Sequence, residues 1–283
     1  MGKTLSEPGC ETYYRKDVSE MDESIIKELS QYVLTAEEEK EEIIKITEAL
    51  RPELNIDEAY MVQEELIRKK MEKGQKVIGP KMGITSEAKM KQMNVDNPIY
   101  GYVFDYMVTE DGGAVSAGNF IHPKVEPEIA FILSEDLQGP GITVDDVLEA
   151  TEFILPALEI IDSRYENFNF TLPDVIADNT SAAGAVYGTD LTKPEDVDLD
   201  TVEVTLVING EVQDAGTGAA ILGHPANSIA RLANMLGEKG RKVSAGERIL
   251  AGAVTQAIPI KPGDHVVAKY GGEMGEVSFK VTD

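Results

Sequence analysis

Two glutamates, Glu126 and Glu128, stand on either side of one proline at the start of the apolar run 129–133. Side chains two apart in a strand point to the same face, so both carboxylates would project together. Burying them without a partner would cost on the order of several kcal/mol, and a divalent cation would neutralise them. Oxygen ligands at this spacing suit Mg²⁺ or Mn²⁺. The alternative is an edge strand with two solvated glutamates, in which Pro127 removes one ladder donor.

A third carboxylate, Glu159, interrupts the apolar segment 155–161. A glutamate in such surroundings is rarely buried without a partner. Three carboxylates with water molecules could complete the octahedral coordination of a metal ion. The alternatives are a salt bridge from Glu159 to Arg164 or Arg231, or an exposed strand end. Asp162 points to the opposite face, and we expect it to pair with Arg164.

Two lysines lie close in sequence to features that could bind a ligand. Lys81 is flanked by Gly79 and Gly83, where a ligand could approach the backbone closely. There it could bind a carboxylate or polarise a carbonyl group, or it could be an ordinary surface lysine in a turn. Lys124 lies two residues before Glu126 and shares its face, so it could pair with the glutamates or reach a substrate.

A polar cluster, Asp178, Asn179 and Ser181, follows an apolar stretch. These side chains could orient water or substrate oxygens, or they could build an Asx turn. The three histidines of the chain are far apart and lack the spacing of metal ligands. The glycines at 216 and 218 lack the strand and helix that a dinucleotide-binding loop requires.

The composition excludes several classes of function. The chain has 283 residues, with 26 Lys and Arg against 51 Asp and Glu, which gives a net charge of −25. This charge argues against binding to nucleic acid or to an anionic membrane surface. Cys10 is the one cysteine, so an internal disulfide is excluded. Without a long apolar run or a signal-peptide pattern, we expect a cytoplasmic protein.

Hydrophobic spacing divides the chain into two parts. Residues 1–75 are expected to form an N-terminal helical cap or arm, with 1–16 mobile and the charge run 37–42 on a solvated helix face. Its helices would begin at Ser24, at a capping box of Thr35 and Glu38, and after Asn55. Residues 76–283 are expected to form an α+β domain with a β-roll or barrel-like core. Strands are predicted at 102–108, 125–133, 155–164, 202–209, 247–251, 264–270 and 275–281, and helices at 87–93, 143–153 and 226–239.

Several motifs occur in an order that resembles the hydratase/decarboxylase branch of the fumarylacetoacetate hydrolase superfamily, over about residues 55–283. They are Gly79-Pro80-Lys81-Met82-Gly83, Pro98-Ile99-Tyr100-Gly101, the string 121–131 around Glu126-Pro127-Glu128, the string 158–165 around Glu159, the string 172–179, and Leu222-Gly223-His224-Pro225. The resemblance implies a mixed β-roll at 76–283 as the catalytic domain, beside an N-terminal helical region. It implies a Mg²⁺ or Mn²⁺ site on Glu126, Glu128 and Glu159, and an active-site lysine at Lys81.

Two activities of this branch compete. In the vinylpyruvate hydratases an acidic residue is expected before the aromatic residue of the Pro-x-aromatic-Gly turn, and here that position is Ile99. The resemblance therefore favours metal-dependent decarboxylation of 2-oxo-3-hexenedioate to 2-hydroxypenta-2,4-dienoate and CO₂, a step of aromatic meta-cleavage catabolism. Hydration of 2-hydroxypenta-2,4-dienoate is the alternative. The expected catalytic residues are Lys81, Lys124, Asn179 and Ser181, and the expected substrate contacts are Ile99 and Asp178.

Two further classes of function make different demands on the sequence. A carbon–carbon hydrolase would need a general base to activate water, and the segment after Gly83 has no histidine motif to provide one. A non-catalytic acidic subunit that binds a partner hydratase would not need to bind metal. The resemblance makes us expect a homo-oligomer and a complex with a vinylpyruvate hydratase, with an oxo-dicarboxylic acid as the substrate.

Overall fold

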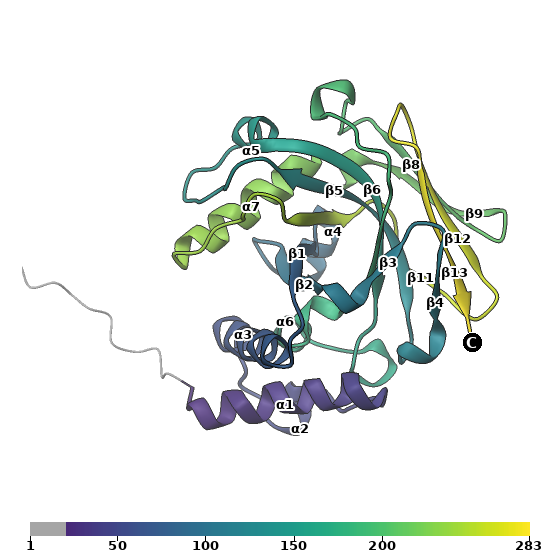
Figure 1. Ribbon diagram of the computed structural model, residues 1–283. Coiled ribbons are helices and arrows are strands. Elements are labelled where there is room, and N and C mark those ends of the chain that lie inside the picture. The colour runs from purple at the N-terminus through teal and green to yellow at the C-terminus, as the bar shows by residue number, and fades with distance from the viewer. Residues whose placement is uncertain (1–20) are drawn as a thin grey trace, which may run out of the picture.

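Three helices open the part of the chain that the computed structural model describes, residues 21–283 (Figure 1). They are α1 (Glu23–Glu39), α2 (Ile46–Ala49) and α3 (Ile56–Glu72), and α3 contacts both α1 and the later helix α6 (Leu172–Ala177). The arm expected at 1–16, with Cys10, lies outside the described residues. None of the helices in residues 21–283 combines the length and apolar character needed to cross a membrane.

The ends of these helices are set by local side chains. The Asp22 side chain accepts a hydrogen bond from the backbone of Ser24 at the start of α1, and Asn55 begins α3 with a capping box. The capping box predicted at Thr35 and Glu38 is wrong. Both residues lie inside α1, because this helix continues to Glu39 and ends where the backbone turns left-handed at residue 40.

Two sheets form most of the remaining fold. The eight-stranded sheet runs in the order β2-β1-β10-β5-β6-β7-β3, with β11 paired to β5, and the five-stranded sheet in the order β4-β13-β12-β8-β9. Figure 1 shows the five-stranded sheet at the right and the N-terminal helices below the large sheet. The strands of the large sheet are β1 (Val77–Gly83), β2 (Ile99–Phe104), β3 (Val108–Glu110), β5 (Lys124–Leu133), β6 (Thr151–Ile161), β7 (Ala182–Tyr187), β10 (Arg248–Ala253) and β11 (Ile258–Pro259). Those of the smaller sheet are β4 (Gly113–Ser116), β8 (Glu203–Ile208), β9 (Glu211–Thr217), β12 (His265–Tyr270) and β13 (Glu276–Thr282).

Most predicted elements are found within two residues of their expected bounds. The helices are α4 (Glu87–Met93), α5 (Val144–Ala150) and α7 (Pro225–Glu238). The strand predicted at 102–108 is wrong, because β2 ends at Phe104 and a single 3₁₀ turn separates it from β3. The predicted helix 143–153 also ends early, since the chain becomes strand β6 at Thr151. Strand β7 was missed because its sequence is rich in alanine and glycine, which have low strand propensity.

The helices and the sheets share one hydrophobic core. Val33 of α1 and Leu66 of α3 belong to the same buried cluster as Phe131 of β5 and Leu250 of β10. The expectation of an α+β fold with an N-terminal helical region is therefore confirmed. The division of the chain into domains at about residue 75 stays a prediction.

Candidate metal centre and substrate cavity

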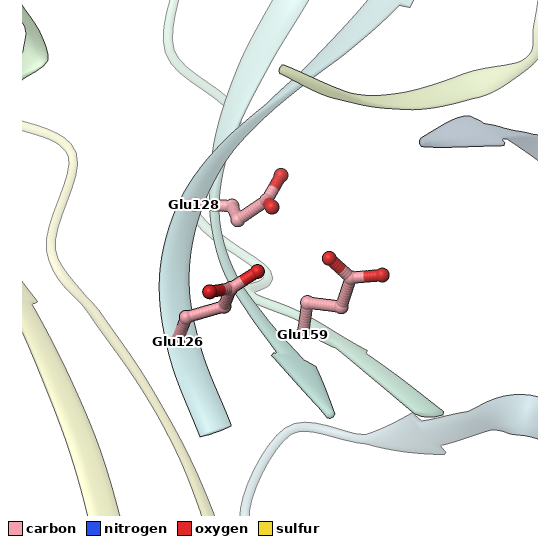
Figure 2. Close-up of side chains that lie close together, drawn as sticks. All are labelled: Glu126, Glu128 and Glu159. Carbon is pink, nitrogen blue, oxygen red and sulfur yellow. The ribbon is translucent and has the colours of Figure 1, made fainter. Parts of the chain in front are cut away.

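Three carboxylates meet on one face of the large sheet. Glu126 and Glu128 project from β5, and the antiparallel register of β5 with β6 places Glu159 directly opposite Glu126. One carboxylate oxygen from each residue lies within 4.8 Å of the other two. Figure 2 shows the three side chains pointing toward one another. Strand alternation thus produces the pair, and strand pairing adds the third member.

This cluster is buried, and several of its oxygens lack hydrogen-bond donors. Glu128 and Glu159 are fully buried, and Glu126 is 6% exposed. Oε1 of Glu128 and both oxygens of Glu159 accept no hydrogen bond from the described residues. The other oxygen of Glu128 accepts a hydrogen bond of 2.8 Å from the backbone N–H of Gly252. A buried oxygen that accepts no hydrogen bond costs folding free energy. These oxygens therefore indicate a bound group, such as a cation, that the described side chains do not provide.

Lys81 is the cation next to the cluster. Its Nζ lies 3.0 Å from Oε2 of Glu159, an ion pair without the alignment of a hydrogen bond. The same Nζ donates a hydrogen bond of 3.1 Å to the carbonyl oxygen of Thr180. With all four groups ionised, three carboxylates and one ammonium carry 1 − 3 = −2 charges. A divalent cation would balance that charge.

The pKa values of the cluster show the same imbalance. Burial raises the pKa of Glu159 to about 7, although Lys81 acts to lower it. Burial, followed by the charges of Glu159 and Glu126, raises the pKa of Glu128 well above its ordinary value. Burial alone would lower the pKa of Lys81, but the surrounding carboxylates outweigh burial and raise it. The oxygen-only donor set and its charge fit Mg²⁺ or Mn²⁺, which Glu126, Glu128 and Glu159 would hold.

A cavity of ≈ 670 Å³ opens beside the cluster. Its lining combines the polar residues Lys81, Lys124, Glu126 and Ser181 with the apolar residues Ile99, Ile161, Phe168 and Phe170. A pocket with mainly apolar walls and a few converging polar groups is typical of a small-molecule site. Four of the residues predicted to catalyse or to contact substrate therefore lie on this cavity: Lys81, Ile99, Lys124 and Ser181.

A left-handed turn closes one side of the cavity. Asn179, Thr180 and Ser181 have φ of 48°, 54° and 56°, a region that costs non-glycine residues roughly 1–2 kcal/mol each. Asn179 does not line the cavity. Its side-chain amide accepts a hydrogen bond from the backbone N–H of Tyr102 and donates one to the Tyr102 carbonyl oxygen. Thr180 supplies the carbonyl oxygen that holds Lys81. The buried hydroxyl of Ser181 lacks a partner among the described residues and is the group of this turn left for a ligand.

Asp178 lies behind this turn and not on the cavity. Its carboxylate is fully buried, 3.3 Å from Nε of Arg164, and accepts a hydrogen bond from the backbone N–H of the same arginine. Burial raises the pKa of Asp178 to about 7, against the opposing effect of Arg164. The predicted pair of Asp162 with Arg164 is wrong. The Asp162 carboxylate accepts hydrogen bonds from the backbone N–H groups of residues 121 and 122.

Arg164 has a second partner in the helical region. Its NH2 group lies 3.1 Å from Glu37 of α1, and Glu37 also binds Lys70 of α3 at 2.6 Å and Tyr106 at 2.6 Å. Lys70 and Arg164 pull the pKa of Glu37 down to about 2, although burial acts to raise it. The prediction that the charge run 37–42 forms a solvated helix face is therefore wrong at Glu37, and also at residues 40–42, which follow the end of α1.

Two residues that the sequence reasoning missed support the site. Gly252 has φ +121°, and a Cβ placed on it would lie 2.1 Å from Oγ1 of Thr85. The absence of a side chain at this position therefore lets the backbone N–H reach Glu128. A glycine within an apolar strand was the feature of the sequence that could have indicated this close approach. Phe168 places its ring centroid 3.7 Å from Nζ of Lys124. The position of Phe168 depends on the conformation of a loop, and the sequence has no pattern that predicts this conformation.

Known proteins resemble this chain over most of its length. The family model "Fumarylacetoacetate (FAA) hydrolase C-terminal" matches residues 73–282. A 4-oxalocrotonate decarboxylase of Pseudomonas sp. (strain CF600) is 46% identical over 244 residues, 86% of this chain and 92% of that protein. A 2-hydroxyhexa-2,4-dienoate hydratase of Comamonas testosteroni is 40% identical over 234 residues, 82% of this chain and 88% of that protein.

A solved structure resembles nearly the whole chain. It is a 4-oxalocrotonate decarboxylase from Pseudomonas putida G7 complexed with magnesium and adipate, with a TM-score of 0.90 and 42% identity over 92% of this chain and 98% of that one. The fold is thus the mixed α+β fold of these enzymes, as the sequence motifs predicted. The relatives include both decarboxylases and hydratases. With the family model covering most of the sequence, the chain belongs to the fumarylacetoacetate hydrolase family.

Proposed function

We propose that this protein decarboxylates 2-oxo-3-hexenedioate to 2-hydroxypenta-2,4-dienoate and CO₂, with Mg²⁺ or Mn²⁺ held by Glu126, Glu128 and Glu159. The observation that carries the proposal is the buried, under-bonded carboxylate cluster that opens on a cavity with Ile99 in its wall. The similarity to 4-oxalocrotonate decarboxylases, one of them complexed with magnesium and a dicarboxylate, supports it.

The chemistry requires an electron sink at the oxo end of the acid. A cation bound by the three glutamates would polarise the 2-oxo group and stabilise the negative charge that grows on its oxygen. When the C5–C6 bond breaks, its electron pair forms C4=C5, the C3=C4 pair moves to C2=C3, and the oxo oxygen gains the charge. C6 leaves as CO₂, and the oxygen takes up a proton to give the 2-hydroxydienoate.

The residues of the chain have separate tasks in this scheme. The ammonium group of Lys81, beside Glu159, supplies a fixed positive charge near the growing oxyanion or a substrate carboxylate. The Thr180 carbonyl fixes the direction of the Lys81 ammonium group. The free hydroxyl of Ser181 can donate a hydrogen bond to a substrate oxygen. We assign Asn179 and Asp178 to the support of the turn that carries these groups.

Ile99 favours decarboxylation over hydration. It lines the cavity and is 3% exposed. Hydration of a diene needs a proton donor and an activated water molecule, whereas the loss of CO₂ needs no base at the bond that breaks. Hydration of 2-hydroxypenta-2,4-dienoate is the second candidate, because a hydratase is 40% identical to this chain.

The test compares two substrates with and without metal. Metal-depleted protein, alone and with added Mg²⁺, is incubated with 2-oxo-3-hexenedioate and in parallel with 2-hydroxypenta-2,4-dienoate. We expect Mg²⁺-dependent CO₂ release from the first and little hydration of the second. Hydration without CO₂ release would establish the hydratase instead. Full activity in the absence of metal would contradict the role of the glutamates.

If the protein is inactive on both substrates, a measurement of Mg²⁺ binding separates the remaining explanations. If the protein also fails to bind Mg²⁺, the result favours a non-catalytic partner of a hydratase. If it binds Mg²⁺ through the glutamates, another oxo acid becomes the substrate to seek. A homo-oligomer and a complex with a vinylpyruvate hydratase remain predictions, which sedimentation of the protein alone and mixed with such a hydratase would test.

A further inference from the structure

Lys124 is a cation on the cavity wall that forms no salt bridge with any carboxylate of residues 21–283. Its Nζ lies over the ring of Phe168, 3.7 Å from the centroid. Lys81, by contrast, is occupied by Glu159 and by the Thr180 carbonyl. A half-buried ammonium group without a carboxylate partner favours an anionic ligand.

Lys124 and the carboxylate cluster face the same cavity. Lys124 and Glu126 are two residues apart in β5, so their side chains point to the same face, and both line the cavity. An acid whose oxo end lies at the glutamates can therefore extend along the cavity with its other end toward Lys124.

The loop that carries Phe168 is anchored, which fixes the ring that holds Lys124. Asn167 and Phe168 both have left-handed φ, of 58° and 57°. The Asn167 N–H donates to Oε2 of Glu42 at 3.4 Å, and Oε1 of Glu42 lies 2.9 Å from Nδ1 of His122. The His122 ring in turn contacts the Phe168 ring, with centroids 5.2 Å apart. The helical region thus contributes, through Glu42, to the placement of a wall of the cavity.

We propose that Lys124, held by Phe168, binds the distal carboxylate of the substrate and makes the site select 2-oxo dicarboxylic acids over monocarboxylic acids of the same length. The inference rests on the proposed function, since it takes the oxo end of the acid to lie at the glutamates. Lys89 also lines the cavity, but it is exposed on α4, where a solvated charge contributes little to binding.

The test uses two acids that cannot react by the proposed route. 2-Oxohexanedioate lacks the C3=C4 double bond that relays the electron pair, and 2-oxohexanoate also lacks the distal carboxylate. Calorimetric titration in the presence of Mg²⁺ gives the affinity of each acid for the wild-type protein and for the variants Lys124→Met, Lys124→Arg and Lys89→Met. We expect Lys124→Met to weaken binding of 2-oxohexanedioate about 10- to 100-fold and to leave 2-oxohexanoate unchanged. Lys124→Arg should retain the preference, and Lys89→Met should behave as wild type.

The possible outcomes separate this inference from the proposed function. Three outcomes would each overturn the inference. Lys124→Met could weaken the binding of both acids equally, the wild type could bind both acids equally well, or Lys89→Met could lose the preference for the diacid while Lys124→Met keeps it. A selective loss in Lys124→Met supports it even if the wild type releases no CO₂ from 2-oxo-3-hexenedioate, a result that would count against the proposed function alone. The thermal unfolding of each variant shows whether it is folded before its affinities are compared.

Discussion

Metal-depleted protein should lose stability as the pH rises from 5 to 8, and Glu159 should cause a defined part of that loss. Burial raises the pKa of Glu159 in the folded state to about 7, from an ordinary value of 4.5. Between these two values the unfolded chain releases the proton while the folded protein keeps it. A rising pH therefore favours the unfolded state, and the effect is complete above pH 7.

The size of the effect follows from the shift. A difference of about 2.5 pKa units corresponds to about 3 kcal/mol of unfolding free energy. For a chain of this length that is a fall in Tm of about 6 °C. Mg²⁺ should remove the loss, because a bound cation takes the place of the proton. The rise in Tm on adding Mg²⁺ should therefore be larger at pH 8 than at pH 5.

Calorimetric scans of metal-depleted protein from pH 5 to pH 8, with and without Mg²⁺, measure this directly. The matched variant is Glu159→Gln, which has nearly the same shape and no proton to lose in this range. It should show a weaker pH dependence and a small response to Mg²⁺. Glu128 and Asp178, whose pKa values burial also raises, should supply the pH dependence that remains. Mg²⁺ should reduce the part due to Glu128 and leave the part due to Asp178 unaltered.

Three results would refute the reasoning. The first is a Tm of the metal-depleted protein that stays constant or rises from pH 5 to pH 8. The second is an equal gain on adding Mg²⁺ at both pH values. The third is an unchanged pH dependence in Glu159→Gln, which would mean that another group carries the proton.

Three further changes probe the site and its support. Glu126→Gln should abolish Mg²⁺-dependent turnover while the circular dichroism spectrum stays that of the wild type; undiminished turnover would remove this residue from the site. Gly252→Ala should weaken Mg²⁺ binding about 10-fold or more, because the added Cβ meets Thr85 and displaces an N–H that orients a ligand. Gly112→Ala, at another left-handed glycine with open space around it, is the control that should bind Mg²⁺ normally. Arg164→Met should cost about 3–5 kcal/mol in urea unfolding, because it leaves the buried Asp178 without a cation and Glu37 with Lys70 alone, and a loss below 1 kcal/mol would contradict this account.

The sequence predicted the parts of the site that depend on local geometry. Glu126 and Glu128 had to share a face if their segment was a strand, whatever lay next to it. Glu159 was a candidate because of its apolar neighbours, but its place opposite Glu126 depends on the register of two strands. Register is a property of the pairing, and a single sequence does not state it. The motifs shared with the family placed Glu159 in the same site as Glu126 and Glu128, which hydrophobic periodicity alone could not do.

Contacts between distant segments were the part that failed. Arg164 was expected to pair with Asp162, two residues away, and it pairs instead with Asp178 and Glu37. Glu37 looked like one more charge on a solvated helix face, since helical spacing shows which side a residue faces and not what covers that side. The turn at 179–181 was likewise beyond prediction, because asparagine, threonine and serine adopt a left-handed backbone only where their surroundings impose it.

The ion cluster of Glu37, Lys70, Arg164 and Asp178 has a consequence for how such proteins can be recombined. Glu37 and Lys70 pair within the N-terminal helices, and Arg164 and Asp178 pair within the β-rich part. The ion pair of Glu37 with Arg164 joins the two parts. A chimera that joins the helices of one relative to the β-rich part of another would have to keep opposite charges at the positions of Glu37 and Arg164. The two parts of the chain are therefore expected to be inherited together, and a substitution in the cluster in one part should favour a compensating change in the other.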